Sequence, residues 1–415
     1  MKILYQLFIF LYSFFARILA FFNPKAKLWV DGRKQIFNKL ALSFENNTNK
    51  VVWVHCASLG EFEQGRPIIE KLKKENTEIK ILLTFFSPSG YEIQRKYEYA
   101  DWVFYLPIDT KSNAEKFYTI VNPTLIIFIK YEFWYYYLFE AKKRYISLIL
   151  VSGIFRNNQP FFKWYGSLHR EMLQSFTHFF IQGQLSYDVL TSIYKKHNIS
   201  ICGDTRFDRV LEIANESYEN SLIENFIQHS KVVVAGSTWY EDDLIIDHFA
   251  NSHPKIKFII APHEINEDRL TECLTFYKNA VLLSQLEESV RNFNVLIIDN
   301  IGILSKLYRY GTVCYIGGGF GGDGVHNILE AAVYNKPVVF GPVYEKYREA
   351  VEMVDSNAAI SIKSAIELEK VLDKLMNDEH LRNDFSSKAD LYIKNNIGAS
   401  QKIVDFIYAN RLLTN

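Results

Sequence analysis

Short apolar runs rich in β-branched residues alternate with amphipathic stretches along most of this chain. Such runs predict buried strands, and the amphipathic stretches predict helices between them. Six strands are predicted in the first half, over residues 51–55, 79–85, 102–106, 125–129, 146–151 and 179–182. Five more follow, over residues 231–235, 257–261, 295–298, 312–316 and 337–340. Strands that alternate with helices require parallel sheets covered on both faces.

The alternation occurs twice, on either side of a polar linker near residues 203–228. It therefore predicts an α/β protein of two doubly wound, Rossmann-like domains, which 415 residues accommodate at roughly 100–200 residues per domain. An amphipathic helix is expected over residues 63–75, with Pro67 in its first turn, where a proline is tolerated. The expected division is a membrane anchor at 1–24, domains at 25–215 and 216–395, and a C-terminal helix at 396–415 that packs back on the first domain.

Residues 3–22 are apolar except for Gln6, Ser13 and Arg17. As a helix they are long enough to cross about 30 Å of hydrocarbon. A cleaved signal peptide is disfavoured, because only Met1 and Lys2 precede the stretch and no small-x-small cleavage site follows it. A membrane-spanning helix and an in-plane anchor both remain open. The basic residues at 25, 27, 33, 34 and 39 outnumber the one acid at 31, which predicts that the rest of the chain is cytoplasmic.

Charge and cysteine content exclude other classes of protein. The 47 basic and 47 acidic residues cancel, whereas a nucleic-acid-binding protein needs a basic surplus. The four cysteines, at 56, 202, 273 and 314, lack metal-binding spacing and are predicted to be buried thiols. Neither an Asp-x-Asp pattern nor a His/carboxylate cluster indicates a catalytic metal.

The most informative motif is a glycine-rich run in the second half, with six glycines among residues 317–324. A predicted strand ends at Ile316, and a helix that can favour an anion at its N-terminus is expected to follow. Asn327 and Glu330 would lie on one face of that helix and reach a sugar hydroxyl. An ordinary flexible loop is the alternative, since the run matches neither the dinucleotide-binding fingerprint nor the P-loop.

Polar residues also follow other predicted strands. Glu61 begins a helix after the first strand, where it can act as a general base or simply be an acid favoured by the helix dipole. Glu132 and Arg206 also lie at strand ends of the first domain. Ser237, Thr238 and His263 occupy corresponding places in the second, although a serine there is more often a helix cap.

Taken in order, these motifs resemble the Kdo (3-deoxy-D-manno-octulosonic acid) transferases of lipopolysaccharide synthesis. The motifs are GRK at 32–34, HCASLGE at 55–61, TFFSPSG at 84–90, YLPID at 105–109, YEFW at 131–134, GDTRFD at 203–208, AGSTW at 235–239 and GVHNILEAA at 324–332. The resemblance implies a glycosyltransferase-B fold at the inner membrane. It also implies that Kdo passes from CMP-Kdo to a lipid A precursor of the lipid IVA type, with inversion and without a metal.

By the same resemblance, Glu61 would be the general base, and Glu132 and Arg206 would stabilise the transition state. The donor CMP-Kdo would contact Ser237, Thr238, Pro262, His263, Ile301, Gly302, Gly318, Gly319, Phe320, Gly321, Asn327, Ile328, Leu329 and Glu330. The implied partners are CMP-Kdo, the lipid A precursor and membrane lipid, with no nucleic acid and no further cofactor.

The chain departs from the family pattern in several places. The arginine usually beside the equivalent of His263 is absent, Ile303 replaces an acid, and Tyr135-Tyr136 replaces Pro-Asn. An aromatic and basic segment over 156–170 is interpreted either as an acceptor surface or as core. Its members are Arg156, Phe161, Phe162, Lys163, Trp164, Tyr165 and Arg170.

Three other functions remain open. They are a transferase of this fold with a different nucleotide sugar, a nucleotide-sugar epimerase on the same scaffold, and a non-catalytic membrane-tethered binding protein.

Overall fold

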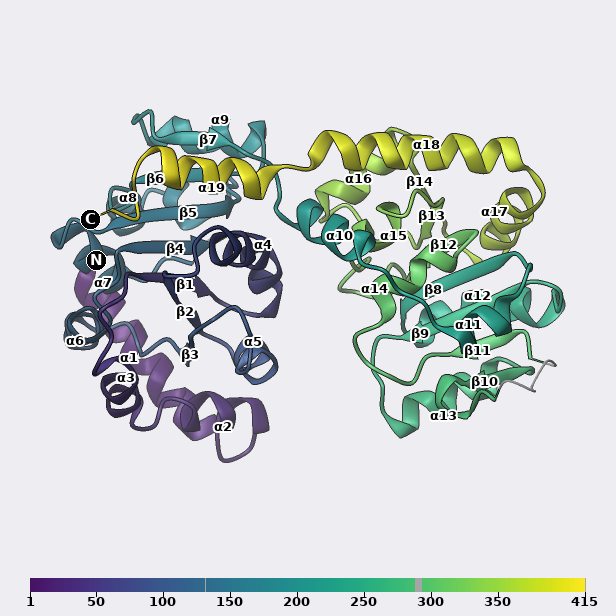
Figure 1. Ribbon diagram of the computed structural model, residues 1–415, viewed down its shortest axis with the longest axis horizontal. Coiled ribbons are helices and arrows are strands. Elements are labelled where there is room, and N and C mark those ends of the chain that lie inside the picture. The colour runs from purple at the N-terminus through teal and green to yellow at the C-terminus, as the bar shows by residue number, and fades with distance from the viewer. Residues whose placement is uncertain (131, 288–292, 415) are drawn as a thin grey trace. The chain divides into compact units, whose positions relative to one another are not determined.

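The computed structural model describes residues 1–130, 132–287 and 293–414. The chain forms two compact units, one of Met1–Arg209 with Ile397–Asn415 and the other of Val210–Asn396. Each unit contains one seven-stranded parallel sheet with helices on its faces (Figure 1). The predicted α/β class with two doubly wound domains is confirmed. The division falls inside helix α10, before the position expected from the sequence.

The sheet of unit 1 has the strand order β3-β2-β1-β4-β5-β6-β7. Its central strands are continuous apolar runs because helices cover both faces, and all six residues of β1 are buried. The strands are β1 (Val51–Cys56), β2 (Lys80–Phe85), β3 (Trp102–Tyr105), β4 (Leu125–Ile129), β5 (Ser147–Gly153), β6 (His178–Ile181) and β7 (Ile199–Ile201).

The helices of unit 1 begin with α1 (Lys2–Leu19), α2 (Pro24–Asp31) and α3 (Ile36–Phe44). Those that cover the sheet are α4 (Leu59–Glu75), α5 (Pro88–Gln94), α6 (Lys111–Val121), α7 (Tyr135–Lys143), α8 (Ser167–Leu173), α9 (Gln184–Ile193) and α19 (Ala399–Ala409). Helix α10 (Arg206–Asn215) starts in this unit and leads into the next.

The sheet of unit 2 has the order β10-β11-β9-β8-β12-β13-β14. Its strands are β8 (Val232–Thr238), β9 (Lys257–Pro262), β10 (Ala280–Leu282), β11 (Val295–Ile297), β12 (Val313–Ile316), β13 (Val338–Phe340) and β14 (Ala359–Ser361). Its helices are α11 (Ser221–Ile227), α12 (Tyr240–Ser252), α13 (Glu267–Phe276), α14 (Leu304–Leu307), α15 (Leu329–Ala332), α16 (Arg348–Asp355), α17 (Ala365–Asn377) and α18 (Glu379–Asn396).

All eleven predicted strands form, within a few residues of the expected ends. The sequence missed β7, β10 and β14, each three residues long and each at the edge of its sheet. An edge strand is only partly covered, so its residues need not form the apolar run by which buried strands are recognised.

Two local expectations were wrong. Helix α4 begins at Leu59, so Pro67 lies in the helix interior and not in its first turn. Pro67 is buried there, although it cannot donate a helical hydrogen bond. The polar stretch expected as a linker near 203–228 instead contains α10 and α11.

The chain returns to unit 1 between α18 and α19. The Asp208 carboxylate accepts hydrogen bonds from the backbone N–H groups of Gly398 and Ser400, which begin α19. Ile403 and Ile407 of α19 are fully buried in the same apolar cluster as residues of α4. This carboxylate therefore fixes the first turn of the last helix on unit 1.

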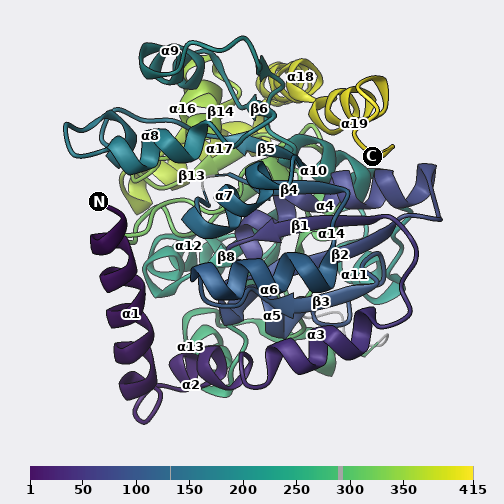
Figure 2. The ribbon, with the colours of Figure 1, turned by 90° about the vertical axis from the view of Figure 1, so that its left-hand side faces the viewer.

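Helix α1 is the one helix of the described chain that is long and apolar enough, by length and composition, to cross a membrane. It lies along unit 1 (Figure 2) and is followed by α2. Arg33, predicted to belong to a basic collar, instead donates hydrogen bonds to the carbonyls of Trp29, Phe86 and Leu106 at 2.8–3.0 Å. Burial lowers the pKa of its guanidinium to about 9, so Arg33 stays cationic at neutral pH. Its hydrogen bonds attach the segment after α2 to the rest of unit 1.

Candidate functional site

Each sheet has a point where the strand order reverses, and ligands of doubly wound sheets bind beyond the carboxyl ends of the strands at that point. In unit 1 it lies between β1 and β4, and in unit 2 between β8 and β12. Glu61 and Glu132 follow β1 and β4, which pair directly. Ser237 and the glycine-rich run lie at the ends of β8 and β12. Four of the predicted positions thus lie at the two reversal points.

Glu61 lies in the first turn of α4, with both carboxylate oxygens engaged. The Ser58 hydroxyl donates a hydrogen bond to Oε2, and the Lys130 ammonium lies 3.7 Å from Oε1. Lys130 directly follows β4 and adopts a left-handed backbone conformation, with φ of 71°. A lysine held in that sparsely populated region is typical of a functional position. Lys130 was not among the predicted site residues, although its place directly after a predicted strand could have indicated it.

Glu132 lies beside a buried chain of hydrogen bonds. The indole of Trp53 donates to the Thr84 hydroxyl at 2.7 Å, and His55 Nδ1 lies 2.9 Å from the same oxygen. The indole of Trp134 donates to His55 Nε2 at 3.1 Å. Because Nε2 accepts this bond, His55 is neutral and carries its proton on Nδ1.

The carboxylate of Glu132 gains no hydrogen bond from this chain. Its Oε2 lies 3.6 Å from His55 Nε2, which has no proton to donate. That oxygen is buried and has no hydrogen-bond partner among the described residues. A buried acceptor without a partner is costly, so Glu132 Oε2 is suited to a hydroxyl or N–H supplied by a substrate.

Arg206 is held on the same side of unit 1. Its Nε and one terminal nitrogen donate to Asp204 Oδ2 at 2.9 and 2.7 Å. The neighbouring Thr205 hydroxyl donates to the Gln64 carbonyl of α4 and contacts Ser152 at the end of β5. Thr205 therefore attaches the start of α10 to the helix that carries Glu61, and the three predicted catalytic residues all follow strands of one sheet.

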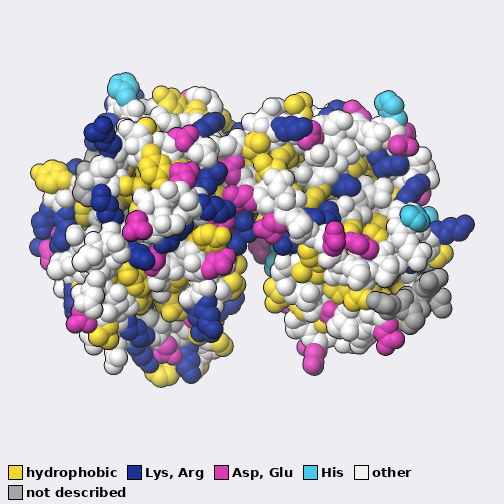
Figure 3. Space-filling view, viewed as in Figure 1, with side chains coloured by type: hydrophobic (Ala, Val, Ile, Leu, Met, Phe, Trp, Pro, Cys, Tyr) yellow, Lys and Arg dark blue, Asp and Glu magenta, His cyan; other side chains and the backbone are white. Residues whose placement is uncertain are grey.

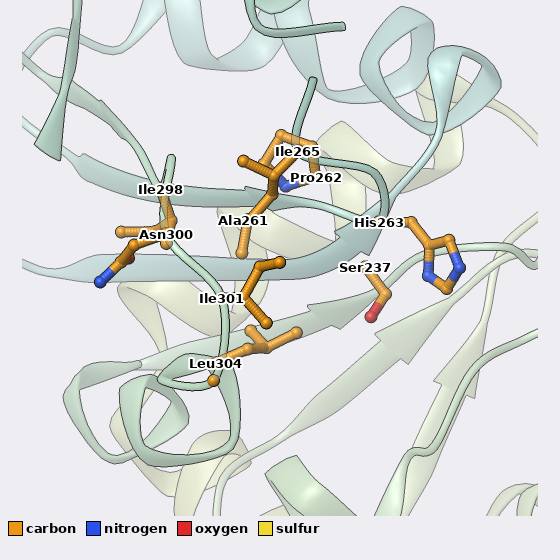
Figure 4. Close-up of a pocket in the computed structure, with 10 residues that line it drawn as sticks. Ser237, Ala261, Pro262, His263, Ile265, Ile298, Asn300, Ile301 and Leu304 are labelled. Atoms are coloured by element: carbon orange, nitrogen blue, oxygen red, sulfur yellow. The ribbon is translucent and has the colours of Figure 1, made fainter. Parts of the chain in front are cut away.

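A pocket of about 210 Å³ lies at the carboxyl ends of β8, β9 and β11 in unit 2, beside the reversal (Figure 4). Five predicted donor contacts line it: Ser237, Pro262, His263, Ile301 and Gly302. The sequence analysis missed the other five, which are Ala261, Ile265, Ile298, Asn300 and Leu304. The lining is mainly apolar, with the Ser237 hydroxyl, the His263 ring and the Asn300 amide as its polar groups. Ser237 also has a left-handed backbone, with φ of 55°.

Three planar rings stack beside the pocket. The His263 ring lies 4.6 Å from that of Trp239 and 4.3 Å from that of His326, nearly parallel to both. The Trp239 indole donates to His326 Nε2 at 2.9 Å. Burial and the neighbouring His263 lower the pKa of His326 to about 4, and burial lowers the pKa of His263. Both imidazoles are therefore neutral near pH 7.

The glycine-rich run is held tightly. The Asp242 carboxylate accepts the N–H of Gly318 at 2.8 Å and that of Trp239 at 2.9 Å. Gly318 has φ of +87°, and a Cβ there would lie 2.6 Å from the Gly324 carbonyl oxygen. Residues other than glycine are therefore excluded at position 318. Without a side chain there, a ligand can approach the backbone of the loop closely.

The helix expected after this run is shorter than predicted. Helix α15 has four residues and begins at Leu329, so Asn327 precedes it. The Asn327 amide donates to Glu330 Oε1 at 3.1 Å, which keeps these two polar groups together as expected. Ile328 and Leu329 are fully buried, so only their backbone could meet a ligand, and Phe320 packs against the core. Thr238 is also buried, while Gly319 and Gly321 continue the loop.

Residue types that bind metals do not gather here. Within the part of the chain that the structure describes, no group of three or more His, Cys, Asp or Glu side chains could hold a metal ion. The four cysteines are free and buried, as the sequence predicted.

Comparison with known proteins shows which family the chain is similar to. The model of the 3-deoxy-D-manno-octulosonic-acid transferases (kdotransferases) matches residues 33–209, which include Glu61, Glu132 and Arg206. A relative named 3-deoxy-D-manno-octulosonic acid transferase, from Aquifex aeolicus, is 28% identical over 352 residues, or 83% of this chain and 90% of that one. Residues 33–209 therefore match the Kdo transferase family, and a relative of that name aligns with most of the chain.

A second relative and a solved structure widen the comparison. A bifunctional glycosyltransferase/methyltransferase of Fusobacterium nucleatum is 26% identical over 386 residues; the match covers 88% of this chain but only 58% of that longer protein. A putative UDP-N-acetylglucosamine 2-epimerase from Listeria monocytogenes has a TM-score of 0.62 at 12% identity, with 89% of this chain and 98% of that one covered. At that identity the likeness establishes the fold alone, which is the glycosyltransferase-B fold that the motifs implied.

Proposed function

We propose that this protein moves Kdo from CMP-Kdo to a sugar hydroxyl of a lipid A precursor, at the cytoplasmic face of the inner membrane. The observation that carries the proposal is Glu61, whose carboxylate is held by Ser58 and Lys130 at the strand-order reversal of unit 1. That is where a general base for an acceptor hydroxyl belongs in this fold.

In this proposal the reaction is a single displacement. The acceptor hydroxyl oxygen attacks the anomeric carbon of Kdo, and its proton passes to Glu61. The bond from that carbon to the phosphate oxygen breaks, its electron pair leaves with CMP, and the configuration inverts. Ser58 and Lys130 direct the Glu61 carboxylate, which holds the base in a fixed geometry for the transfer. The step needs no metal and no cofactor beyond the donor.

Glu132 and Arg206 have complementary parts in this proposal. The unpartnered Oε2 of Glu132 accepts a hydrogen bond from the acceptor or the sugar. The guanidinium of Arg206, aimed by Asp204, attracts the Kdo carboxylate or the phosphate that leaves. Fixed charges directed at a developing charge are among the larger contributions to catalysis.

Unit 2 binds CMP-Kdo in this proposal. The mainly apolar pocket of Figure 4 takes the flat cytosine base, and the Asn300 amide offers a donor and an acceptor to its edge. The glycine run and the neutral rings of His263 and His326 face the phosphate and sugar. Asn327 and Glu330 form a joined pair of polar groups suited to hydroxyls.

The test is a transfer assay with the purified full chain. It contains a Kdo-activating system with CTP, a tetra-acylated lipid A precursor in detergent, and a mass readout of the lipid product. The lipid is expected to gain the mass of one or more Kdo residues, and EDTA added once CMP-Kdo has formed should not stop the transfer. Replacing the activated donor by UDP-N-acetylglucosamine should give no product. Transfer only from the UDP-sugar, or loss of transfer in EDTA that added Mg²⁺ restores, would refute the proposal.

A further inference from the structure

Helix α1 is attached to unit 1 along one side. The Tyr5 hydroxyl donates to the buried carboxylate of Asp109, and the same hydroxyl accepts the N–H of Tyr135 at 3.3 Å. Two turns further on, the ring of Tyr12 contacts the ring of Trp29. Ile9, between them, is only 5% exposed. Positions 5, 9 and 12 share one helix face, so α1 is docked on unit 1 along residues 5–12.

The opposite face of α1 is apolar and exposed. Leu7, Phe10, Phe14 and Ile18 lie on it, with Phe10 66% exposed. The turn that follows exposes Phe21 and Phe22 at 84% each. A contiguous apolar surface of this kind on a folded protein marks a place that another apolar medium covers.

The charged side chains near this face of α1 indicate which medium covers it. Residues 1–30 contain four basic side chains, Lys2, Arg17, Lys25 and Lys27, and no acidic one. Lys2 is paired with Glu171, but the other three are exposed beside the apolar face. Phenylalanine and leucine flanked by exposed cations are suited to an anionic phospholipid surface, where the rings enter the acyl region and the cations meet headgroups.

A second exposed aromatic segment lies near the start of α1. Lys2 contacts Glu171 of α8, and Figure 2 shows the loop before α8 on the same side of unit 1 as α1. In that loop Trp164 is 92% exposed, whereas Phe161 is buried in the core. Arg170 donates to the carbonyls of Phe161 and Lys163 and so supports the loop. The segment was interpreted as either acceptor surface or core; Phe161 is core, whereas an acceptor surface at Trp164 stays a prediction.

We propose that α1 does not cross the bilayer but lies in the plane of an anionic phospholipid interface, with Trp164 as a second contact. A helix docked lengthwise on a water-soluble unit cannot stand across a bilayer without taking that unit into the hydrocarbon. The proposal concerns how the protein meets its membrane, and it rests on the proposed function only for the identity of the lipid substrate.

The docked face also joins this surface to the candidate site. Tyr12 contacts Phe86, the Phe86 ring stacks 4.6 Å from Trp134, and Trp134 donates to His55 beside Glu132. A continuous row of aromatic side chains therefore runs from the in-plane helix to the carboxylates. An acceptor whose acyl chains stay in the bilayer would have its sugar presented beside α1, without leaving the membrane.

Spin-label depth measurements on the full chain test the proposal. All four native cysteines are buried, so a nitroxide reagent reacts with a cysteine introduced at an exposed site. The variants are Leu7→Cys, Phe14→Cys, Ile18→Cys and Trp164→Cys, with Leu185→Cys, an exposed apolar position on α9, as the matched control. Each is bound to vesicles of equal parts phosphatidylglycerol and phosphatidylcholine, after circular dichroism shows that it is folded.

An in-plane helix gives labels at 7, 14 and 18 the same shallow depth, roughly 5–10 Å below the headgroups, with Trp164→Cys also lipid-exposed and Leu185→Cys in water. A spanning helix separates positions 7 and 18 by about 16 Å in depth. That gradient, or labels in water at all three helix positions, would overturn the in-plane anchor; a label in water at 164 alone would overturn the second contact.

Charge is tested separately. Binding to the mixed vesicles is expected to be at least about tenfold tighter than to phosphatidylcholine alone, and the triple variant Arg17→Gln, Lys25→Gln, Lys27→Gln should lose most of that difference. Equal binding to both vesicles would contradict the choice of an anionic surface. None of these measurements involves transfer, so their failure would leave the proposed reaction standing, and an inactive enzyme would leave the anchor standing.

Discussion

The two strand-order reversals have the same topology but opposite chemistry. At the reversal of unit 1 Glu61 is paired with Lys130, and after β7 of the same sheet Arg206 is paired with Asp204. Beside the reversal of unit 2, the pocket is mainly apolar and bordered by two imidazoles that burial keeps neutral. The space-filling view shows acidic and basic side chains mixed over the visible face of each unit (Figure 3).

The comparison indicates that unit 1 carries out the chemistry and unit 2 recognises the donor. Fixed charges can exchange protons and stabilise charge, whereas an apolar pocket with a few polar groups recognises a ligand by shape. Substitutions in unit 1 should therefore lower the rate of transfer at saturating donor. Substitutions in unit 2 should weaken donor binding and leave that rate closer to normal.

The largest effect is expected for Glu61→Gln, which keeps the size of the side chain but removes the base. Turnover at saturating substrates should fall about 10²–10⁴-fold, the usual contribution of a general base. The measurement is kcat in the transfer assay, with thermal unfolding to show that the fold is intact. Glu75→Gln is the matched control, because Glu75 is an exposed acid at the other end of the same helix. Near-normal turnover by Glu61→Gln would contradict the assignment of proton transfer to unit 1, on which the comparison of the two units depends.

A smaller loss is expected for Arg206→Lys. A lysine keeps the charge but cannot reproduce the two hydrogen bonds from one guanidinium to Asp204, so it is aimed less well. We expect kcat to fall roughly 10–100-fold, with KM for the donor changed less, within the range known for lost electrostatic contacts. Arg95→Lys, at an exposed helix end of the same unit, is the control. A change in KM alone would place Arg206 among the binding residues.

The sequence predicted the strands and the ends at which polar residues gather, because buried strands have a plain signature and the carboxyl ends of parallel strands share one edge. It therefore placed Glu61, Glu132 and Ser237 at strand ends, and the strand order of the structure puts those ends at the reversal points. It could not predict which side chains meet there. Lys130 and His55 come close to the two glutamates only through the pairing of β1 with β4, a contact between residues distant in sequence.

The sequence was also ambiguous wherever one residue type serves two purposes. Arg33 was counted as part of a basic collar, but its neighbours in the fold are backbone carbonyls. Apolar composition alone could not show that Tyr5, Ile9 and Tyr12 face protein while Leu7 and Phe14 do not, since both sets are aromatic or aliphatic. The pocket residues Ile298 and Leu304 were missed for the same reason, because an apolar side chain at a strand end resembles core.

In unit 2, His263→Ala removes the middle ring of the stack and part of the pocket wall. If the pocket binds the donor, KM for CMP-Kdo should rise about tenfold, which corresponds to about 1.4 kcal/mol, while kcat stays within about threefold of normal. Binding of CMP, measured by calorimetry, should weaken by a similar factor. A fall in kcat as large as that of Glu61→Gln would show that unit 2 takes part in the chemistry and would break the comparison.

The smallest effect concerns pH and the neutral state of His326. Its pKa is about 4 in the fold and 6.5 when unfolded, so between these values the unfolded chain binds the proton more strongly. The stability associated with the neutral ring is present above pH 6.5 and is lost as the pH falls towards 4.

Glutamine cannot titrate but can still accept the Trp239 hydrogen bond. The difference in urea midpoint between the wild type and His326→Gln should therefore shrink from pH 7 to pH 5, while His380→Gln, at an exposed position, should show no such trend. A constant difference would mean that His326 is not kept neutral by its surroundings. The uncharged character of the site in unit 2 would then lose its main support.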